Sequence, residues 1–561
     1  MNRRDAETQR FRERSIKFYR LFTSSPFLLF ALCLCVSAVS FSCTTKPSDL
    51  RTLVPAETLV YIETNDLAAA LQPIVDSKPF REVAKTKPDF SALKGVQVAV
   101  AVTGFETSEV AVTDEQAIGK VQPRFVAVAD THAWNYQAVA FAEKKLGSFV
   151  TEIYDAEPKL EKSDKHGGKY FTWKSQDGRK AFALVIDAVI YFGNDESAID
   201  KALSVRNGQA DSIAKTGKVP PHVPGNLATG YVSTDGVAQI AALAGLHFAS
   251  QASDEEEVQS AVAGILPQLI RGTVTDITWS TSQTSEGIED KWSVAMPADV
   301  ASVFSETFGA QDESEIATYQ KNEFIAQLPE NTSTATHYNL KNPLLAWRSL
   351  VLNAARRLDS IEGRVLLEFS SLLFEPYGIR DPEQFLGSFG DPRFVSRSIV
   401  TAKLDEQSDE TIAVLATGDY QARTKALSSD LKPPKELVEG GENIWTADDE
   451  NLQMAFDVQM TRIGSKEDLL RVSGMHSGES RDIKSDLLRR LANSKSPVST
   501  VGRDGSSILA LVDILAREGH GETKAVSTYL TETRFTKTGM ERRTVSDFGF
   551  IGWMIAQLAA E

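Results

Sequence analysis

The side chains that most often carry catalysis or bind metals are few in this chain and lie far apart. The seven histidines are His132, His166, His222, His247, His337, His476 and His520. No two of them are four residues apart, and no His-Glu-x-x-His occurs, so no helix would present a histidine pair to a metal. The cysteines are Cys33, Cys35 and Cys43. The sequence therefore predicts no catalytic, metal-binding or cofactor-binding residue.

Other short motifs that carry chemistry are absent or incomplete. The segment Gly474–Gly478 places His476 beside Ser477, but a base must be oriented in space onto the hydroxyl, so we interpret the segment as a polar turn. No phosphate-binding glycine loop follows a predicted strand. The acidic runs Asp254–Glu257 and Asp448–Glu450 lack the spacing of a calcium loop and are expected to be solvated.

Cys43 is the cysteine for which the surrounding sequence indicates a role. No residue from Leu21 to Thr45 is charged, and the preceding segment is rich in arginine, a pattern typical of an export signal. The end of this segment, Val39-Ser-Phe-Ser-Cys43, resembles the lipobox of bacterial lipoprotein signal peptides. Ser42 supplies the small residue before the cysteine, whereas Ser40 stands where leucine is preferred.

The lipobox resemblance implies that Cys43 receives a lipid and becomes the mature N-terminus. Thr44 follows it, where an aspartate would favour retention at the inner membrane. We therefore expect an exported protein, anchored by its lipid to the outer membrane and facing the periplasm or the cell surface. An uncleaved membrane anchor and an ordinary cleaved signal peptide are the alternatives, since the apolar segment approaches the ~20 residues that span a bilayer.

Composition narrows the class of protein and its partners. The chain has 561 residues, a formal net charge of −16 and no cysteine beyond Cys43. Disulfides and thiolate metal sites are therefore excluded from the body. An acidic body repels phosphate backbones, so nucleic acid is not expected as a partner.

The body has a faint internal duplication. A Pro-x-x-Thr opening followed by a short strand occurs at Pro55 and again at Pro329, with a weaker third copy from Val223. The expected organisation is a signal peptide over 1–43, a polar tether over 44–52, a first half over 53–309, a linker over 310–322 and a second half over 323–561.

Hydrophobic periodicity predicts an α+β fold in two tandem, distantly similar halves, each with antiparallel sheet covered by long helices on one face. Alternating strands are expected at Val96–Val102 and Lys291–Met296, and one long helix over Asn342–Phe374. The C-terminal segment from Arg534 to Trp553 is expected to dock into the second half, with a membrane-touching tail as the alternative. Core packing is the expected role of the tryptophans, with a ligand groove between the halves as the alternative. They are Trp134, Trp173, Trp279, Trp292, Trp347, Trp445 and Trp553.

The order of these features resembles an uncharacterised bacterial family, a domain of unknown function found in large exported proteins. The resemblance rests on the Pro-x-x-Thr openings, on a hairpin-to-helix step of the form Trp…Gly-x-x-(Glu/Asp), and on the closing segment Arg542–Gly549. It could cover residues 53 to 561, and it implies no activity.

These observations predict a non-catalytic, membrane-tethered envelope lipoprotein that binds an envelope protein or an apolar ligand, or has a structural role. A lipid or lipoprotein carrier with an apolar cavity is the first alternative. An envelope hydrolase is the second, and it would need a buried polar triad or a carboxylate pair in a cleft.

Overall fold

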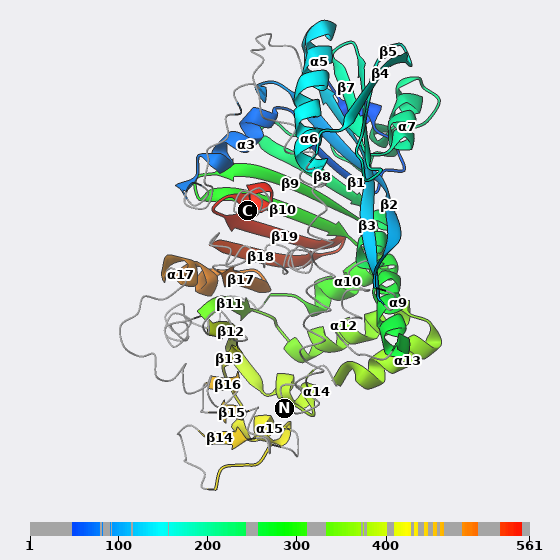
Figure 1. Ribbon diagram of the computed structural model, residues 1–561. Helices are drawn as coiled ribbons and strands as arrows, with labels where there is room; N and C mark the ends of the chain where they lie inside the picture. The colour runs from blue at the N-terminus through cyan, green and yellow to red at the C-terminus, as the bar shows by residue number, and fades with distance from the viewer. Residues whose placement is uncertain are drawn as a thin grey trace.

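The protein has an α+β fold in which one wide antiparallel sheet is flanked by helices (Figure 1). The computed structural model describes residues 48–78, 81, 90, 93–113, 116–154, 156–242, 256–310, 332–371, 374, 378–400, 409–427, 431–435, 443–446, 453–456, 460–464, 485–502 and 528–552. Cys43, the Gly474–Gly478 segment, the acidic run Asp448–Glu450 and nearly all of the predicted linker lie outside these residues.

The described residues form a sheet of 19 strands. In chain order the strands are β1 (Val60–Thr64), β2 (Gln97–Thr113), β3 (Gln116–Asp130), β4 (Lys159–Lys165), β5 (Gly168–Lys174), β6 (Lys180–Ile186), β7 (Val189–Gly193), β8 (Asn226–Ser233), β9 (Asp276–Thr284), β10 (Gly287–Ala295), β11 (Thr332–Tyr338), β12 (Phe389–Val400), β13 (Asp409–Gly418), β14 (Asn443–Thr446), β15 (Gln453–Phe456), β16 (Met460–Gly464), β17 (Val498–Gly502), β18 (Tyr529–Thr536) and β19 (Gly539–Ser546).

Helices connect the strands. They are η1 (Leu50–Leu53), α3 (Leu67–Val75), α5 (Asn135–Phe141), the π-helical η3 (Ala142–Leu146), α6 (Gly147–Tyr154), α7 (Glu196–Arg206), η4 (Ile213–Thr216), α9 (Glu256–Thr273), α10 (Ala298–Thr307), α12 (Pro343–Arg357), α13 (Ser360–Phe369), α14 (Pro382–Gly387), α15 (Tyr420–Lys425) and α17 (Ser485–Asn493). No helix in the described part of the chain combines the length and apolar composition needed to span a bilayer.

The strand order reads the same way from both ends of the sheet. On one side the neighbours run β5, β6, β7, β3, β2, β1, β8, β9, β10, with β4 outside β5. On the other they run β14, β15, β16, β13, β12, β11, β17, β18, β19. The two series meet where β10 pairs with β19, which we call the seam.

Matching residues occupy matching places on the two sides of the seam. Gly287 and Gly539 begin β10 and β19 with φ of +135° and +143°, a backbone region that only glycine adopts readily. In the turn before each glycine, a threonine hydroxyl donates to the glycine carbonyl, over 2.9 Å from Thr284 and 3.1 Å from Thr536. Lys291 and Arg543 lie directly opposite each other at the centre of the pairing.

Both faces of the sheet are covered in the N-terminal series of strands. Alternate residues of β2 and β3 enter two different cores: Val98 and Ala127 pack with α3, α5, η3 and α6, whereas Ala99 and Val126 pack with η1, η4 and α7. The prediction of helices on one face only is therefore wrong for this part. The apolar runs in these strands are continuous because both of their faces are buried.

The C-terminal series has its own core beneath α17. Leu488 and Leu491 of this helix pack with Ala335, Val501 and Leu530 of the sheet. By the strand register, Leu530 and Val501 share a face with Glu532 of β18 and Arg543 of β19. The same helix therefore lies beside a charged strip of the seam.

The predicted long helix over Asn342–Phe374 is two helices. Helix α12 ends before Leu358, and the Asp359 side chain caps α13 by accepting from the backbone amides of Ile361 and Glu362. The expected apolar stripe does not cover a sheet face, because Leu345, Leu350, Ile361 and Val365 are exposed. The spacing of apolar residues predicted that this stretch is helical, but the Asp359 N-cap divides it into two helices.

The prediction that the C-terminal segment docks into the second half holds for β19, which pairs with β18, but is wrong for the apolar end after it. Phe548 and Ile551 are buried in the core that contains α3 and Trp279 of β9. Phe550 stands edge-on to Trp279, with ring centroids 5.5 Å apart. On the other side of the seam, α10 packs against β18 and β19, where Phe308 lies 4.6 Å from Phe535. Each side of the seam thus carries the helical segment that follows the last strand of the other side: α10 follows β10, and residues 549–552 follow β19.

Candidate functional site

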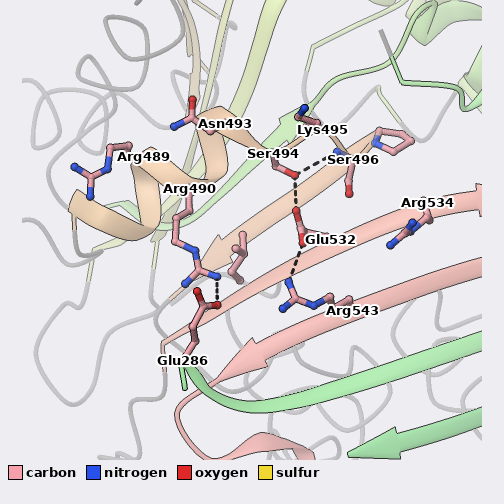
Figure 2. Close-up of a pocket in the computed structure, with 12 residues that line it drawn as sticks. Glu286, Arg489, Arg490, Asn493, Ser494, Lys495, Ser496, Glu532, Arg534 and Arg543 are labelled. Carbon is pink, nitrogen blue, oxygen red and sulfur yellow. Dashed lines mark hydrogen bonds and ion pairs between the residues drawn. The ribbon is translucent and has the colours of Figure 1, made fainter. Parts of the chain in front are cut away.

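A groove of about 630 Å³ opens between α17 and the strands at the seam (Figure 2). Helix α17 and the residues after it form one wall, β18 and β19 form the floor, and Glu286 of the β9–β10 turn closes one end. We call this feature the seam groove. Its lining residues are Glu286, Arg489, Arg490, Asn493, Ser494, Lys495, Ser496, Pro497, Leu530, Glu532, Arg534 and Arg543.

The seam groove is rich in cations although the whole chain is acidic. Three of its arginines are paired with carboxylates: Arg490 with Glu286 at 2.8 Å, Arg543 with Glu532 at 3.1 Å, and Arg534 with Glu541 at 3.4 Å. Arg489 and Arg534 are exposed and extend from α17 and β18 (Figure 2). The lining itself contains five cationic side chains and two carboxylates, a surplus that would attract an anionic group, and guanidinium groups can bind a carboxylate with two hydrogen bonds.

A chain of charged groups continues from the groove across the seam. Glu532 accepts a hydrogen bond of 2.8 Å from the Ser494 hydroxyl. Arg543 also pairs with Glu289 of β10, and Lys291 contacts the same carboxylate at 2.7 Å. Burial raises the pKa of Glu289, but the hydrogen bonds from Lys291 and Arg543 outweigh it and leave that pKa below its ordinary value. Glu289 is therefore charged and holds both cations in place.

A second polar cluster lies where the described chain begins. The Ser48 amide donates to Gln97 over 2.7 Å, and the Gln97 side chain returns a bond of 3.0 Å to the Ser48 carbonyl oxygen. The Ser48 hydroxyl donates to Asp130 over 2.7 Å. His132 lies 3.3 Å from Asp130 through Nδ1 and 3.1 Å from Gln97 through Nε2. The cluster joins Ser48 to the first residue of β2 and the last residue of β3.

This cluster contains a serine, a histidine and an aspartate, but they are not arranged as a nucleophile and its base. The hydroxyl of Ser48 donates to Asp130 rather than to His132, and the other nitrogen of His132 faces an amide. A nucleophile needs its base on the hydroxyl itself. The left-handed backbone of His132, with φ +49°, serves to turn its ring back towards Asp130.

The structure separates the residues that sequence inspection singled out. His132, His166, His222 and His337 belong to different parts of the fold, and the described residues contain no group of three or more histidine, cysteine or acidic side chains placed to hold a metal. Trp173, Trp279 and Trp445 are buried as expected. Trp134 is 75% exposed, so core packing is the wrong prediction for it.

Sequence inspection missed the seam groove. Arg489 and Arg490 lie on α17, and Arg534 and Arg543 come from a hairpin about fifty residues later, beyond a long segment outside the described residues. Only the Arg542-Arg543 pair was visible, as part of the closing motif. Their meeting depends on strand pairing between distant segments, for which a single sequence carries no signal.

The comparisons with known proteins add no relative. No family model, no curated protein and no solved structure matches the chain.

Proposed function

We propose that the protein is a non-catalytic lipoprotein of the bacterial envelope, exported and tethered by a lipid on Cys43, whose body binds an acidic segment of an envelope protein in the seam groove. The observation that carries the binding role is the excess of cations in the groove on a chain of net charge −16. Such a local reversal of charge favours an acidic partner segment over a basic one.

The two alternative functions have less support in the described residues. A lipid carrier needs an enclosed apolar cavity, whereas the seam groove is open and lined mainly by charged and polar side chains. A hydrolase needs a nucleophile engaged by a base, and the Ser48–Asp130–His132 cluster has its serine hydroxyl on the carboxylate. We also propose that the chain belongs to the bacterial family of exported proteins of unknown function that its sequence resembles.

We also propose that the body consists of two related halves that arose by duplication and pair edge to edge. The mirrored strand order supports this, as do the matching turns at Gly287 and Gly539 and the helix that follows the last strand of each half. The axis relating the halves would pass between Lys291 and Arg543, the residues facing each other at the centre of the seam.

Reversing two exposed charges of the groove should abolish its preference for acidic peptides. In Arg489→Glu/Arg534→Glu, we expect binding of a fluorescein-labelled oligoglutamate peptide to weaken at least about tenfold, because each reversal replaces attraction by repulsion. Fluorescence anisotropy at roughly 50 and 200 mM salt measures the dissociation constant of the peptide. Binding to the wild-type protein should weaken at the higher salt concentration.

The matched control reverses two exposed lysines remote from the groove, Lys144→Glu/Lys180→Glu, with the same change in net charge. It should retain wild-type affinity. Equal losses in both double variants would mean that net charge, not the groove, attracts the peptide, and the assigned site would be discarded.

Mass spectrometry of the protein purified from membranes tests the tether. We expect a mature N-terminus at Cys43 carrying acyl mass, and we expect Cys43→Ala to leave the precursor unacylated and the signal segment uncleaved. An intact Met1 on the wild-type protein would contradict lipidation and favour the uncleaved anchor. Ser42→Ala, which keeps a small residue before the cysteine, is the control and should be processed normally.

A further inference from the structure

The chain is fixed to the body almost immediately after Cys43. Ser48 makes hydrogen bonds through its amide, carbonyl and hydroxyl groups to Gln97 and Asp130. The Asp49 side chain then caps η1, whose Leu50 is fully buried. The last residues of the predicted 44–52 tether are therefore part of the packed body.

This attachment limits how far the body can lie from Cys43. Only Thr44, Lys46 and two other residues separate Cys43 from Ser48. A fully extended chain spans at most ~3.6 Å per residue, so five steps give a reach of about 18 Å. The headgroup layer on one side of a bilayer takes up roughly 5–8 Å of that distance. A lipid on Cys43 therefore brings the surface around Ser48 close to the bilayer.

That surface carries two exposed aromatic side chains. Trp134 is 75% exposed at the end of the loop that leads from His132 into α5, and Tyr136, which is 69% exposed, lies in the first turn of α5. His132 itself belongs to the cluster that holds Ser48. In Figure 1 this loop lies at the top of the view, far from β14 at the bottom. Tryptophan and tyrosine are the residues enriched at bilayer interfaces, where an apolar ring and a polar tip are both satisfied.

We propose that Trp134 and Tyr136 insert into the headgroup region of the membrane that holds the lipid, and thereby fix the orientation of the body. The occupant of this surface is a bilayer recognised by aromatic rings rather than by charge, because the charged side chains nearby are paired with each other. Asp187, whose carbonyl accepts from Asn135, is paired with Arg206. Arg51, close to Ser48, is paired with Asp49. The inference rests on the proposed lipid at Cys43. It leaves the seam groove, on the other side of the molecule's N-terminal core, open to a partner.

The absence of cysteine from the mature body beyond Cys43 makes a site-specific test possible. The full-length lipoprotein with Tyr136→Cys is labelled with an environment-sensitive thiol probe and reconstituted into phosphatidylcholine–phosphatidylethanolamine vesicles that contain nitroxide-labelled lipid. The matched control is Ile444→Cys, an exposed apolar position on β14 at the far edge of the sheet. Mass spectrometry verifies one probe per chain.

We expect vesicle flotation of both labelled proteins, with strong nitroxide quenching at position 136 and little at position 444. Flotation without quenching at 136 would overturn the membrane-facing surface, as would equal quenching at both positions, while leaving the lipid tether intact. Failure of the wild-type protein to float would instead overturn the tether, and with it this inference. Trp134→Ser should reduce quenching at 136 without lowering the melting temperature, because the Trp134 side chain is exposed and serine is a favoured N-cap residue for α5.

Discussion

Replacing Asp290 by alanine should lower the free energy of unfolding by about 2–4 kcal/mol, because two donors lose their acceptor. The Asp290 carboxylate is fully buried and accepts 3.0 Å and 2.8 Å bonds from Trp279 Nε1 and the Phe550 amide. It thereby fastens the C-terminal segment to β9 and β10. Urea unfolding followed by tryptophan fluorescence measures the loss.

Asp290 should also make stability depend on pH. Burial raises the pKa of Asp290 to about 6, although its hydrogen bonds lower it in part. The folded protein therefore keeps the proton at pH values where the unfolded chain has lost it. The contribution of protonated Asp290 to the free energy of unfolding is fully present below pH ~4. It is lost as the pH rises through about 6, which lowers the free energy of unfolding by up to ~3 kcal/mol.

Asp290→Asn removes this dependence, since the amide does not titrate. The wild type should exceed the asparagine variant in stability by more at pH 4 than at pH 7. Asp164→Asn, an exposed position on β4, should change stability by less than about 0.5 kcal/mol at either pH. A stability difference between wild type and Asp290→Asn that stays constant from pH 4 to 7 would show that Asp290 does not titrate in this range.

Alanine at Gly539 should open the seam and destabilise the protein by about 3 kcal/mol or more. Its φ of +143° is costly for any residue with a Cβ, by roughly 1–3 kcal/mol. The Cβ would also overlap the carbonyl oxygen of Val294, in the partner strand β10. Hydrogen exchange should accelerate first in β10 and β19, because their mutual ladder is the one disturbed.

Gly178→Ala is the control for this prediction. Gly178 has φ +88° but no atom within 4 Å of where a Cβ would lie, so it carries the conformational cost without the collision. Gly178→Ala should lower the free energy of unfolding by about 1 kcal/mol. Gly287→Ala, at the matching turn, should resemble Gly539→Ala, since its Cβ would meet the Ser546 carbonyl. Equal losses of unfolding free energy in Gly178→Ala and Gly539→Ala would show that the collision with Val294 does not add to the cost.

Local sequence patterns predicted the parts of this fold that depend on neighbours in the chain. The strands around Val98 and Lys291 occur where the alternation of apolar and polar residues placed them. The α+β class followed from these elements. Helix boundaries were less predictable, because one capping side chain, that of Asp359, divides a continuous apolar periodicity.

The features that matter for function depend on contacts between distant segments. The seam joins β10 to β19, the Phe550 ring packs on Trp279, and Ser48 is bound by Gln97 and Asp130. Each contact links positions whose separation leaves no periodic trace in one sequence. The exposed state of Trp134 was missed for the same reason, since exposure is decided by what the rest of the fold leaves uncovered.

The outermost strand, β4, has a further consequence. It pairs only with β5 within the described residues, and its sequence Lys-Leu-Glu-Lys-Ser-Asp-Lys is mostly exposed. The unpaired backbone amides and carbonyls of an edge strand can pair with a strand of another chain. A strand added to β4 would have to place its side chains beside lysines and acidic residues. The charged outer edge of β4 therefore disfavours the addition of a further strand at this end of the sheet.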